Sequence, residues 1–288
     1  MFCRGKENKR HIGEMLIEMR DKMKKAIFLD IDGTLIDALG GLTEISPQVE
    51  KEIRMLQEKG AYVFVATGRP YAFINKSLLE FGFDGFILNN GAQVMINNET
   101  IGSTPMGSDF INQFVPVLED KGIQYVLEDD KHAYMKASHK AFSQFYESVG
   151  IGKECFKCDY DHEQLNVYKI EIMCPNEEVL NQCVAFISQH SEYGYFQSID
   201  DIHLEVYFKK NTKAAGIIKA TQYLNIPIEN TYAFGDGRND IEMLDIVGCG
   251  IAMGNASDEV KQYANVVTDT VHNDGVAVGI RKYINDNR

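Results

Sequence analysis

Cysteines, basic residues and long apolar runs are all scarce in this chain. The six cysteines among 288 residues form no dense disulfide framework, which is typical of proteins from a reducing cytoplasm. Asp and Glu outnumber Lys and Arg by 42 to 29, so the net charge is −13 and a nucleic-acid-binding surface is not expected. No apolar run approaches the ~20 residues needed to cross a bilayer. We therefore expect a cytoplasmic protein that binds neither nucleic acid nor membrane.

In its other residue types the chain has the composition of an ordinary globular protein. The chain is 44% hydrophobic and 25% charged, and it is long enough for one large or two ordinary domains. Cys155 and Cys158 form a single CxxC pair followed by His162. A zinc site of this kind normally uses a second pair of ligands, and none stands nearby. We therefore interpret these cysteines as ordinary thiols.

The N-terminal segment, residues 1–22, differs in charge from the rest of the chain. Residues 1–25 hold eight Lys or Arg against four Asp or Glu, a net charge of +4. The segment also lacks the unbroken apolar core of a secretory signal. Two interpretations stay open. The segment forms a short amphipathic helix, or translation starts at Met23, which we favour.

Strands and helices are predicted to alternate from residue 25 onward. The apolar run 26–29 predicts a buried strand. Ser46 and Pro47 are typical of a helix start, and the helix that follows has apolar residues at helical spacing: Val49, Ile53 and Leu56. Further strands are expected at 61–66 and 86–88. This βαβαβ order indicates an α/β fold with a doubly wound, Rossmann-like parallel sheet.

The pattern changes between about residues 92 and 201. Apolar and polar residues alternate in part over 167–173 and again over 202–208, just beyond this range. This alternation indicates an antiparallel sheet with one covered face, with helices near 108–121, 138–149 and 176–190. The βαβ order returns with a helix from Thr212 and strands at 232–234 and 250–252. We therefore predict an α/β cap domain at 92–201, inserted into a core domain made of 23–91 and 202–288.

Four short motifs follow one another along the predicted core. They are Asp30-x-Asp32-Gly33-Thr34, Thr67-Gly68-Arg69, Lys213 at the start of a helix, and Gly235-Asp236-Gly237-Arg238-Asn239-Asp240. Residues i and i+2 of an extended chain point to the same side, so Asp30 and Asp32 can share one small site if a cation offsets their repulsion. Because parallel strands end at one edge of a sheet, the strand-end motifs are expected to meet there.

In this order the motifs resemble those of the haloacid dehalogenase superfamily, in particular its Cof-like phosphatases with a large α/β cap. The resemblance covers nearly the whole chain after residue 23. It implies a phosphoric monoester hydrolase that uses Mg²⁺ and an aspartyl-phosphate intermediate. The implied substrates are small phosphorylated metabolites, with sugar phosphates first, and the protein would be a monomer or a small homo-oligomer.

The resemblance also implies roles for individual residues. Asp30 would be the nucleophile, and Asp32 the general acid and later the base. Asp236 would bind Mg²⁺ directly, together with the Asp30 carboxylate and the Asp32 carbonyl oxygen, and Asp240 would support the metal through water or by orienting its ligands.

The phosphate group would be bound by Thr67, Gly68, Lys213 and Asn239. Lys209 and Lys210 stand close to Lys213, but the spacing to the following apolar helix favours Lys213. Arg69, Asn90 and Arg238 are weaker candidates.

Two alternatives to a phosphatase remain. A phosphomutase could use the same scaffold, and a non-catalytic regulator could bind phosphorylated metabolites. The intact pair Asp30 and Asp32 argues against the regulator, because binding needs neither a nucleophile nor an acid. Asp32 also argues against a dehalogenase, which has no alkoxide to protonate.

Overall fold

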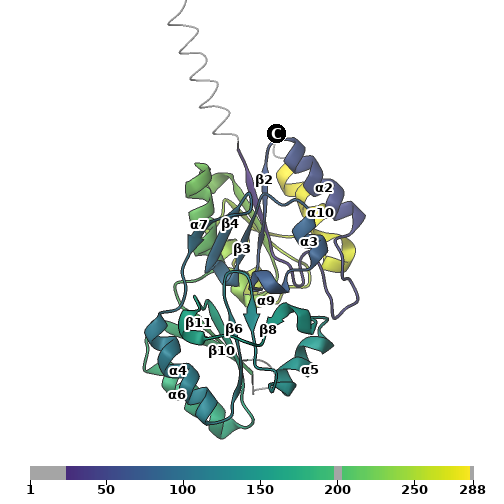
Figure 1. The fold of residues 1–288 in the computed structure, drawn as a ribbon. Helices are drawn as coiled ribbons and strands as arrows, with labels where there is room; N and C mark the ends of the chain where they lie inside the picture. The colour runs from purple at the N-terminus through teal and green to yellow at the C-terminus, as the bar shows by residue number, and fades with distance from the viewer. Residues whose placement is uncertain (1–23, 198–202, 286–288) are drawn as a thin grey trace, which may run out of the picture. The chain divides into compact units, whose positions relative to one another are not determined.

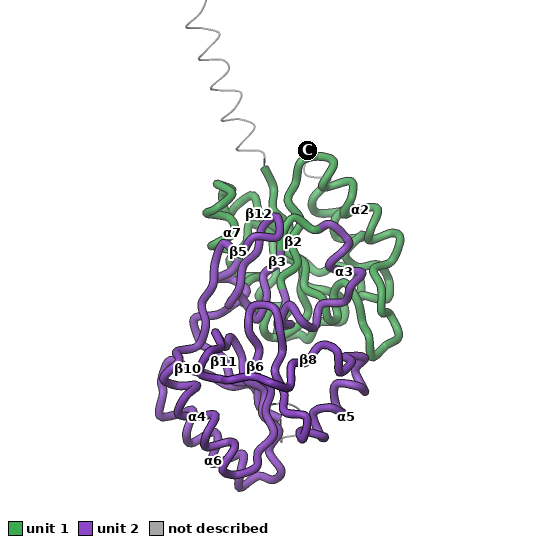
Figure 2. Tube along the Cα trace, viewed as in Figure 1, with its two compact units in different colours: residues 1–66, 83–85, 217–288 green, residues 67–82, 86–216 purple. Residues whose placement is uncertain are grey.

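The computed structural model describes residues 24–197 and 203–285 (Figure 1). The predicted extension at residues 1–22, and Met23, lie outside these ranges. The described chain forms two compact units (Figure 2). Unit 1 comprises the residues up to Ala66, Phe83–Gly85 and the residues from Ile217 onward, and unit 2 comprises Thr67–Gly82 and Phe86–Gly216. Each unit is described by itself.

Unit 1 is built on parallel strands in the order β14-β13-β12-β1-β2. These strands are β1 (Ala26–Leu29), β2 (Tyr62–Ala66), β12 (Thr231–Gly235), β13 (Cys249–Ala252) and β14 (Val266–Val267). All four residues of β1 are buried, as expected for a parallel strand covered on both faces. Because β1 lies between β2 and β12, its carboxyl end is central in this part of the sheet.

Helices flank the sheet of unit 1, with α7 on one side and α2 and α10 on the other (Figure 1). The helices are α2 (Pro47–Glu58), α7 (Lys213–Leu224, whose first turn belongs to unit 2), α8 (Ile241–Ile246), α9 (Asp258–Lys261) and α10 (Gly275–Gly279), with short turns η5 (Ile228–Asn230), η6 (Arg238–Asp240), η7 (Val271–Asn273) and η8 (Ile280–Asn285). The start of α2 agrees with the sequence, since the Ser46 side chain accepts a hydrogen bond from the Val49 amide. Val49, Ile53 and Leu56 are buried, so the predicted apolar stripe of this helix faces the core.

Unit 2 begins with the segment after β2 and contains three strands in the order β3-β4-β5. Its first elements are η1 (Tyr71–Phe73), α3 (Lys76–Glu80), β3 (Gly85–Leu88, with Gly85 in unit 1), η2 (Asn89–Gly91), β4 (Gln93–Ile96) and β5 (Glu99–Ser103). A mostly antiparallel sheet of six strands follows, in the order β10-β11-β9-β6-β7-β8.

The six-stranded sheet and its helices take up the rest of unit 2. The elements are α4 (Ser108–Asp120), β6 (Gln124–Glu128), β7 (Ala133–Tyr134), α5 (Lys140–Ser148), η3 (Lys153–Cys155), β8 (Phe156–Lys157), η4 (His162–Gln164), β9 (Lys169–Met173), α6 (Glu177–Ser188), β10 (Tyr193–Gln197) and β11 (His203–Phe208). The expected helices near 108–121, 138–149 and 176–190 are therefore present. A parallel, Rossmann-like sheet and an antiparallel α/β unit confirm the predicted fold class.

The two faces of the six-stranded sheet differ in chemistry. Strand residues such as Leu127, Ile170 and Leu204 form one apolar core with residues of α4 and α6. The opposite face is not bare, because Val126 packs with residues of α5. The sequence predicted only one covered face, and the short helix α5 accounts for the difference.

The boundaries of the predicted domains stay a prediction. Strand β11 pairs with β9 in the six-stranded sheet, and unit 2 extends to Gly216. The sequence-based boundaries at 91/92 and 201/202 follow changes in hydropathy pattern, whereas the compact units follow contacts, so the two divisions describe different properties.

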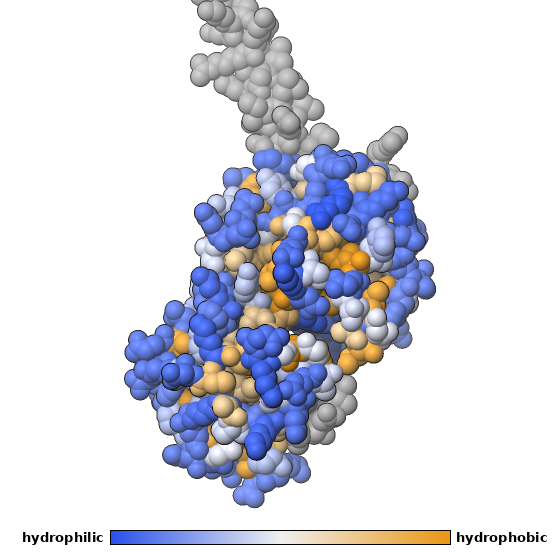
Figure 3. Space-filling model, turned by 45° about the vertical axis from the view of Figure 1, so that its right-hand side comes forward, coloured by the Kyte–Doolittle hydropathy of each residue, from blue (hydrophilic) through white to orange (hydrophobic). Residues whose placement is uncertain are grey.

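The surface is in keeping with the acidic composition. On the face seen in Figure 3, hydrophilic residues predominate and hydrophobic ones form small groups. Over the described ranges, no helix is long and apolar enough to cross a membrane. Cys155 and Cys158 are free thiols and belong to no group of three or more metal-ligating side chains found in the described part of the chain.

Candidate active site

Asp30 lies at the carboxyl end of β1, where the main chain leaves the sheet. Its backbone amide donates a hydrogen bond to the Phe234 carbonyl of β12 at 3.1 Å, and its side chain is buried. A tight turn follows immediately, in which the amides of Leu35 and Ile36 both donate to the Ile31 carbonyl, at 2.9 and 3.0 Å. The turn fixes Asp30 at the edge of the sheet, as the sequence predicted.

Asp30, Asp236 and Asp240 come together at this edge. Each offers a carboxylate oxygen, and these atoms all lie within 4.8 Å of one another. Asp236 directly follows β12, the neighbour of β1. Asp32 is exposed and adds no side-chain oxygen to the group; the role predicted for it at the metal uses its backbone carbonyl.

The buried carboxylate of Asp240 holds the turn that carries Asp236. Its Oδ2 accepts hydrogen bonds from the backbone amides of Asp236 and Gly237, both at 2.9 Å. A Cβ at Gly235 would lie 2.5 Å from the Asp240 Cγ, so only glycine permits this approach. These contacts fit a residue that orients a metal ligand.

The Asp236 carboxylate is itself held from two sides. Thr34 Oγ1 donates to its Oδ1 at 3.1 Å, and Asn255 Nδ2 donates to its Oδ2 at 3.2 Å. The φ angle of Gly33 is +80°, and a Cβ there would lie 2.2 Å from Asp236 Oδ2. Glycine is therefore required both by the backbone conformation and by the nearby carboxylate.

Asn255 is a site residue that the sequence analysis missed. Its Oδ1 accepts from the Val271 amide at 2.9 Å, which fixes the amide orientation, so Nδ2 points at Asp236. The sequence did contain a signal for this residue, because Asn255 follows β13, the strand next to β12 in the sheet. A polar residue after another parallel strand belongs to the same edge.

The donor set of this group consists of oxygen atoms. Three carboxylates so close together repel one another unless a cation lies between them. Oxygen ligands from carboxylates suit Mg²⁺, which keeps several of its waters and is held by few protein ligands. The residues present therefore fit a Mg²⁺ ion, bound by Asp30 and Asp236 and supported by Asp240.

The predicted phosphate-binding residues of unit 2 gather around one strained turn. Thr67 is buried, and its Oγ1 accepts from the Arg69 amide at 3.1 Å, so the hydroxyl proton points to another acceptor. The Asn90 amide donates to the Thr67 carbonyl at 3.0 Å. A Cβ at Gly91 would lie 2.1 Å from the Thr212 carbonyl oxygen, so the turn packs against the start of α7, where Lys213 lies.

Lys213 is fully buried, at 0% exposure. Lysine is almost never buried unless its charge is balanced, so the ordinary interpretation of a helical lysine as solvated surface does not apply. By contrast, Lys209 and Lys210 are exposed, which favours Lys213 among the three. Because Thr67, Gly68 and Lys213 belong to unit 2, their approach to the carboxylates of unit 1 stays a prediction.

Asn89 is a second residue that the sequence analysis missed. Asn89, Asn90 and Gly91 have φ angles of 49°, 51° and 93°, and consecutive left-handed residues of this kind are strained. Asn89 is 4% exposed, and neither its Oδ1 nor its Nδ2 makes a hydrogen bond within the described chain. A buried amide with unmade hydrogen bonds, beside Thr67, marks a position where a ligand could supply the partners.

The remaining candidates lie on the surface of the turn after β12. Asn239 is exposed, so its predicted contact with phosphate stays a prediction. The Arg238 guanidinium pairs with the Glu259 carboxylate at 2.8 Å, and its side chain is 74% exposed. Arg238 is therefore a surface residue whose ion pair links the turn after β12 to α9.

Comparisons with known proteins identify the family of the chain. Residues 27–280 match the family described as haloacid dehalogenase-like hydrolase. The phosphatase YitU of Bacillus subtilis, named for 5-amino-6-(5-phospho-D-ribitylamino)uracil, is 32% identical over 89% of this chain and 96% of the relative. A solved structure from Geobacillus kaustophilus HTA426 has a TM-score of 0.81 at 28% identity, covering 90% of this chain and 98% of the other.

A second solved structure is that of BT4131, described as a sugar phosphatase of haloacid dehalogenase subclass IIB. It has a TM-score of 0.75 at 27% identity and covers 90% of this chain and 99% of its own. The resemblance inferred from the four motifs is confirmed. The chain belongs to the haloacid dehalogenase-like hydrolase family.

Proposed function

We propose that this protein is a Mg²⁺-dependent phosphatase that hydrolyses small phosphorylated metabolites through an aspartyl-phosphate. The chain belongs to a hydrolase family, and two of the proteins reported above, YitU and BT4131, are named phosphatases, so the reaction class is hydrolysis of a phosphoric monoester. The observation that carries the proposal is the group of three carboxylates at the end of β1. It combines a nucleophile with an oxygen-rich place for a cation.

The first half of the reaction transfers the phosphoryl group to Asp30. A carboxylate oxygen of Asp30 attacks phosphorus while the ester P–O bond breaks, and the departing alkoxide takes the proton of Asp32. Bound Mg²⁺ would neutralise charge on the phosphoryl oxygens and the carboxylates. The exposed position of Asp32 suits a group that must exchange protons with substrate and water.

The second half releases inorganic phosphate. Asp32, now a carboxylate, takes a proton from a water molecule whose oxygen attacks the phosphorus of the aspartyl-phosphate. The bond to Asp30 breaks, and both aspartates return to their starting states. Donors from Thr67, Gly68, Lys213 and Asn239 would stabilise the phosphoryl oxygens in both steps.

The first substrates to consider are sugar phosphates, followed by phosphorylated cofactors such as pyridoxal phosphate or flavin mononucleotide. Phosphoryl chemistry needs only the residues of the core, so discrimination among leaving groups falls to the cap domain predicted at 92–201. Sugar phosphates agree with the description of BT4131 as a sugar phosphatase. YitU is named for a phosphoribityl compound, which is also a phosphate ester of a polyhydroxylated chain.

A phosphate-release screen over a panel of metabolites tests the proposal. We expect release from several small monoesters with Mg²⁺ and none after EDTA treatment. The Asp30→Asn variant should be inactive on every substrate, because its amide keeps the shape but not the nucleophilicity of the carboxylate. Transfer of phosphate to a sugar hydroxyl without release would instead indicate a phosphomutase. Absence of turnover with tight binding would indicate a regulator.

A further inference from the structure

The backbone on both sides of Asp32, the proposed general acid, is held by one residue of the following turn, Ile36. The Ile36 amide donates to the Ile31 carbonyl at 3.0 Å, and the Ile36 carbonyl accepts from the Gly33 amide at 2.7 Å. These are the two peptide groups that flank Asp32. Asp32 and Ile36 also form an isolated β-bridge. The direction in which the Asp32 side chain leaves the turn therefore depends on the position of Ile36.

Asp37, the residue after Ile36, begins a short hairpin. The amides of Asp37 and Leu42 each donate to the carbonyl of the other at 2.8 Å. The tip between them carries Leu39, which is 87% exposed. Two-stranded hairpins are marginally stable at best in water, so a contact from outside the hairpin is needed to keep Asp37, and with it Ile36, in place.

His272 of η7 makes such a contact, and like the whole hairpin it belongs to unit 1. Its Nε2 lies 2.9 Å from Asp37 Oδ2, while Asp37 Oδ1 accepts from the Gly40 amide at 2.9 Å. A Cβ at Gly40 would lie 2.2 Å from Asp37 Oδ2 and 2.8 Å from His272 Nε2, so only glycine leaves room for this arrangement. The Asp37 carboxylate thus joins the tip of the hairpin to the imidazole.

Asp37 is an ionised carboxylate in this arrangement. The hydrogen bonds from the Gly40 amide and from His272 lower the pKa of its carboxyl group below the ordinary value. An ionised carboxylate only accepts hydrogen bonds, so Nε2 of His272 carries the proton of their contact. Because the imidazole can donate from Nε2 in its neutral form as well as in its protonated form, the contact does not require a charged histidine.

This contact adds little to the stability of the whole protein. The side chains of His272 and Asp37 are 51% and 33% exposed, and ion pairs between exposed groups contribute little. The chain after the hairpin is also held independently, because the Ser46 hydroxyl donates to the Asp274 carboxylate. Loss of the imidazole should therefore leave the fold intact and free only the hairpin that follows Asp32.

We propose that His272 is a positioning residue for the general acid: its contact with Asp37 keeps the Asp32 carboxyl group where it can protonate the leaving group. This inference rests on the proposed function. In the step concerned, the ester P–O bond breaks, its electron pair stays on the departing oxygen, and that oxygen takes the Asp32 proton. His272 transfers no proton itself. A displacement of about 1 Å at a positioned group can cost on the order of 10²-fold in rate, so a loosened hairpin is enough to weaken acid catalysis.

The test compares phenyl phosphate with p-nitrophenyl phosphate, two esters that differ in their need for an acid. The nitro group stabilises the departing phenolate, so p-nitrophenyl phosphate loses its leaving group with little help from a proton. In His272→Ala the kcat/KM ratio of phenyl phosphate to p-nitrophenyl phosphate should fall at least about threefold, a small part of the roughly 10²–10⁴-fold that a general acid contributes. His272→Gln should restore the wild-type ratio, because its amide can donate to Asp37. Asn273→Ala, which removes an exposed side chain of the same short turn, is the matched control and should leave the ratio unchanged.

A double-mutant cycle tests the route through Asp37. Asp37→Ala alone should lower the ratio at least as much as His272→Ala does, and His272→Ala should then have no further effect, because the acceptor of the imidazole is gone. Independent effects of the two replacements would overturn the inference, and so would an unchanged ratio in His272→Ala. An equal fall of kcat/KM for both esters would also overturn it, since general damage to the site does not discriminate between leaving groups.

Failure of the proposed function has a different signature, since the wild-type protein would then hydrolyse neither ester. In that case hydrogen exchange of the Gly33 and Ile36 amides, which close the turn around Asp32, decides. Faster exchange of these amides in His272→Ala than in Asn273→Ala supports a hold of the imidazole on this turn. Equal exchange in the two variants rejects it.

Discussion

The side-chain amide of Asn255 holds Asp236 and the turn after β1 in a fixed relation. Its Nδ2 donates both to Asp236 Oδ2 at 3.2 Å and to the Gly33 carbonyl oxygen at 2.9 Å. The same nitrogen therefore bridges the loop that carries the proposed nucleophile and the loop that carries the proposed metal ligand. Residues that orient ligands in this way commonly change metal affinity when they are replaced.

Asn255→Ala should weaken Mg²⁺ binding without unfolding the protein. The side chain is exposed, so its loss leaves no buried cavity, but the Asp236 carboxylate loses a donor. We expect the Mg²⁺ concentration for half-maximal phosphatase rate to rise roughly tenfold. Asn273→Ala, which removes another exposed amide that bonds to an aspartate, is the control. Equal Mg²⁺ dependence in both variants would contradict the bridging role.

Gly33→Ala should be far more damaging than Gly41→Ala. Both glycines have positive φ angles, +80° and +85°, so both replacements carry a backbone penalty of at least ~1 kcal/mol. Only the Cβ at Gly33 meets Asp236, whereas the Cβ at Gly41 has nothing within 4 Å. We expect a loss of thermal stability in both variants, larger in Gly33→Ala, with loss of Mg²⁺-dependent activity confined to Gly33→Ala. Loss of activity in both would mean that the backbone, not the carboxylate, is responsible.

Asp30→Asn should reduce turnover at least about 1000-fold, because an amide is a very poor nucleophile toward phosphorus. The melting temperature should stay close to that of the wild-type protein, since size and shape are kept. Asp245→Asn, at an exposed position of α8, controls for loss of a negative charge from the same unit. A folded Asp30→Asn protein with full activity would end the aspartyl-phosphate mechanism.

Asn89→Gly should lower activity while keeping or improving stability. The change removes a buried amide that makes no hydrogen bond in the described chain, and glycine adopts a φ angle of 49° without strain. The control is Asn97→Gly, where an exposed asparagine has a φ angle of 50°. We expect unfolding free energies at or above the wild-type value for both, and a lower kcat/KM for Asn89→Gly alone. A normal kcat/KM would remove Asn89 from the site.

Glu128→Gln should gain stability relative to the wild-type protein as the pH rises. The pKa of Glu128 is raised above its ordinary value of 4.5 by burial. A raised carboxyl pKa adds stability that is complete below about pH 4.5 and is lost as the pH rises through the folded-state value. Glutamine has no such dependence. Urea unfolding without Mg²⁺ from about pH 4.5 to about pH 8 measures the difference, and the same slope for both proteins would show that Glu128 is not protonated in the folded state.

The elements that carry the carboxylates were predictable because their signals are local. A short apolar run that ends in an acid and a glycine predicts a strand and its turn, and parallel strands bring such ends to one edge. Asp30, Asp236 and Asp240 meet for this reason. Asn255 follows the same rule, but a single asparagine after a strand is a weak signal without the geometry of its amide.

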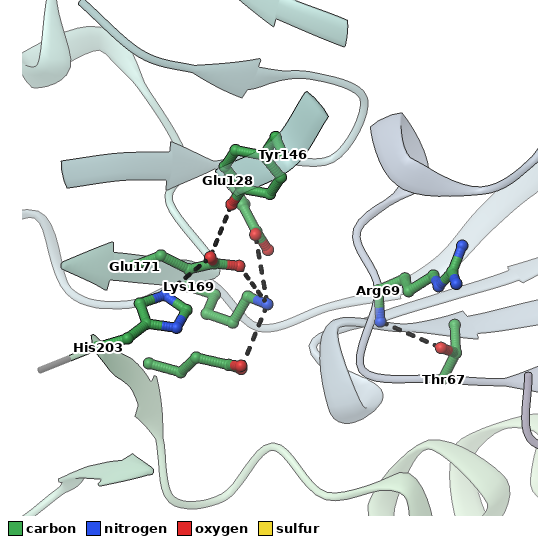
Figure 4. A network of polar contacts seen from close by, with 8 residues as sticks. Thr67, Arg69, Glu128, Tyr146, Lys169, Glu171 and His203 are labelled. Carbon is green, nitrogen blue, oxygen red and sulfur yellow. Dashed lines mark hydrogen bonds and ion pairs between the residues drawn. The ribbon is translucent and has the colours of Figure 1, made fainter. Parts of the chain in front are cut away.

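The buried polar network of Glu128, Lys169, Glu171 and His203 (Figure 4) could not be predicted, because its members come from three strands that are far apart in the sequence. Lys169 and Glu171 alternate with apolar residues, which is the pattern of a solvated sheet face. Their burial arises from pairing with β6 and β11 and from packing of α5 and Phe73 on the same face. The role of Asn89 could not be predicted either. The sequence Asn-Asn-Gly predicts only a turn, and it does not show that the Asn89 side chain is buried.

The packing of Phe73 on Tyr146 has a consequence for how this enzyme could evolve. A ring placed between the hydrogen-bonding network of Glu171 and the backbone that leads back to Thr67 makes these two groups share mechanical constraints. A replacement at Tyr146 that moves the Phe73 ring would therefore also move the backbone that leads to Thr67, a predicted phosphate-binding residue. Changes in the two places would then be inherited together, and lineages that alter one would need compensating replacements at Arg69, Phe73 or Tyr146.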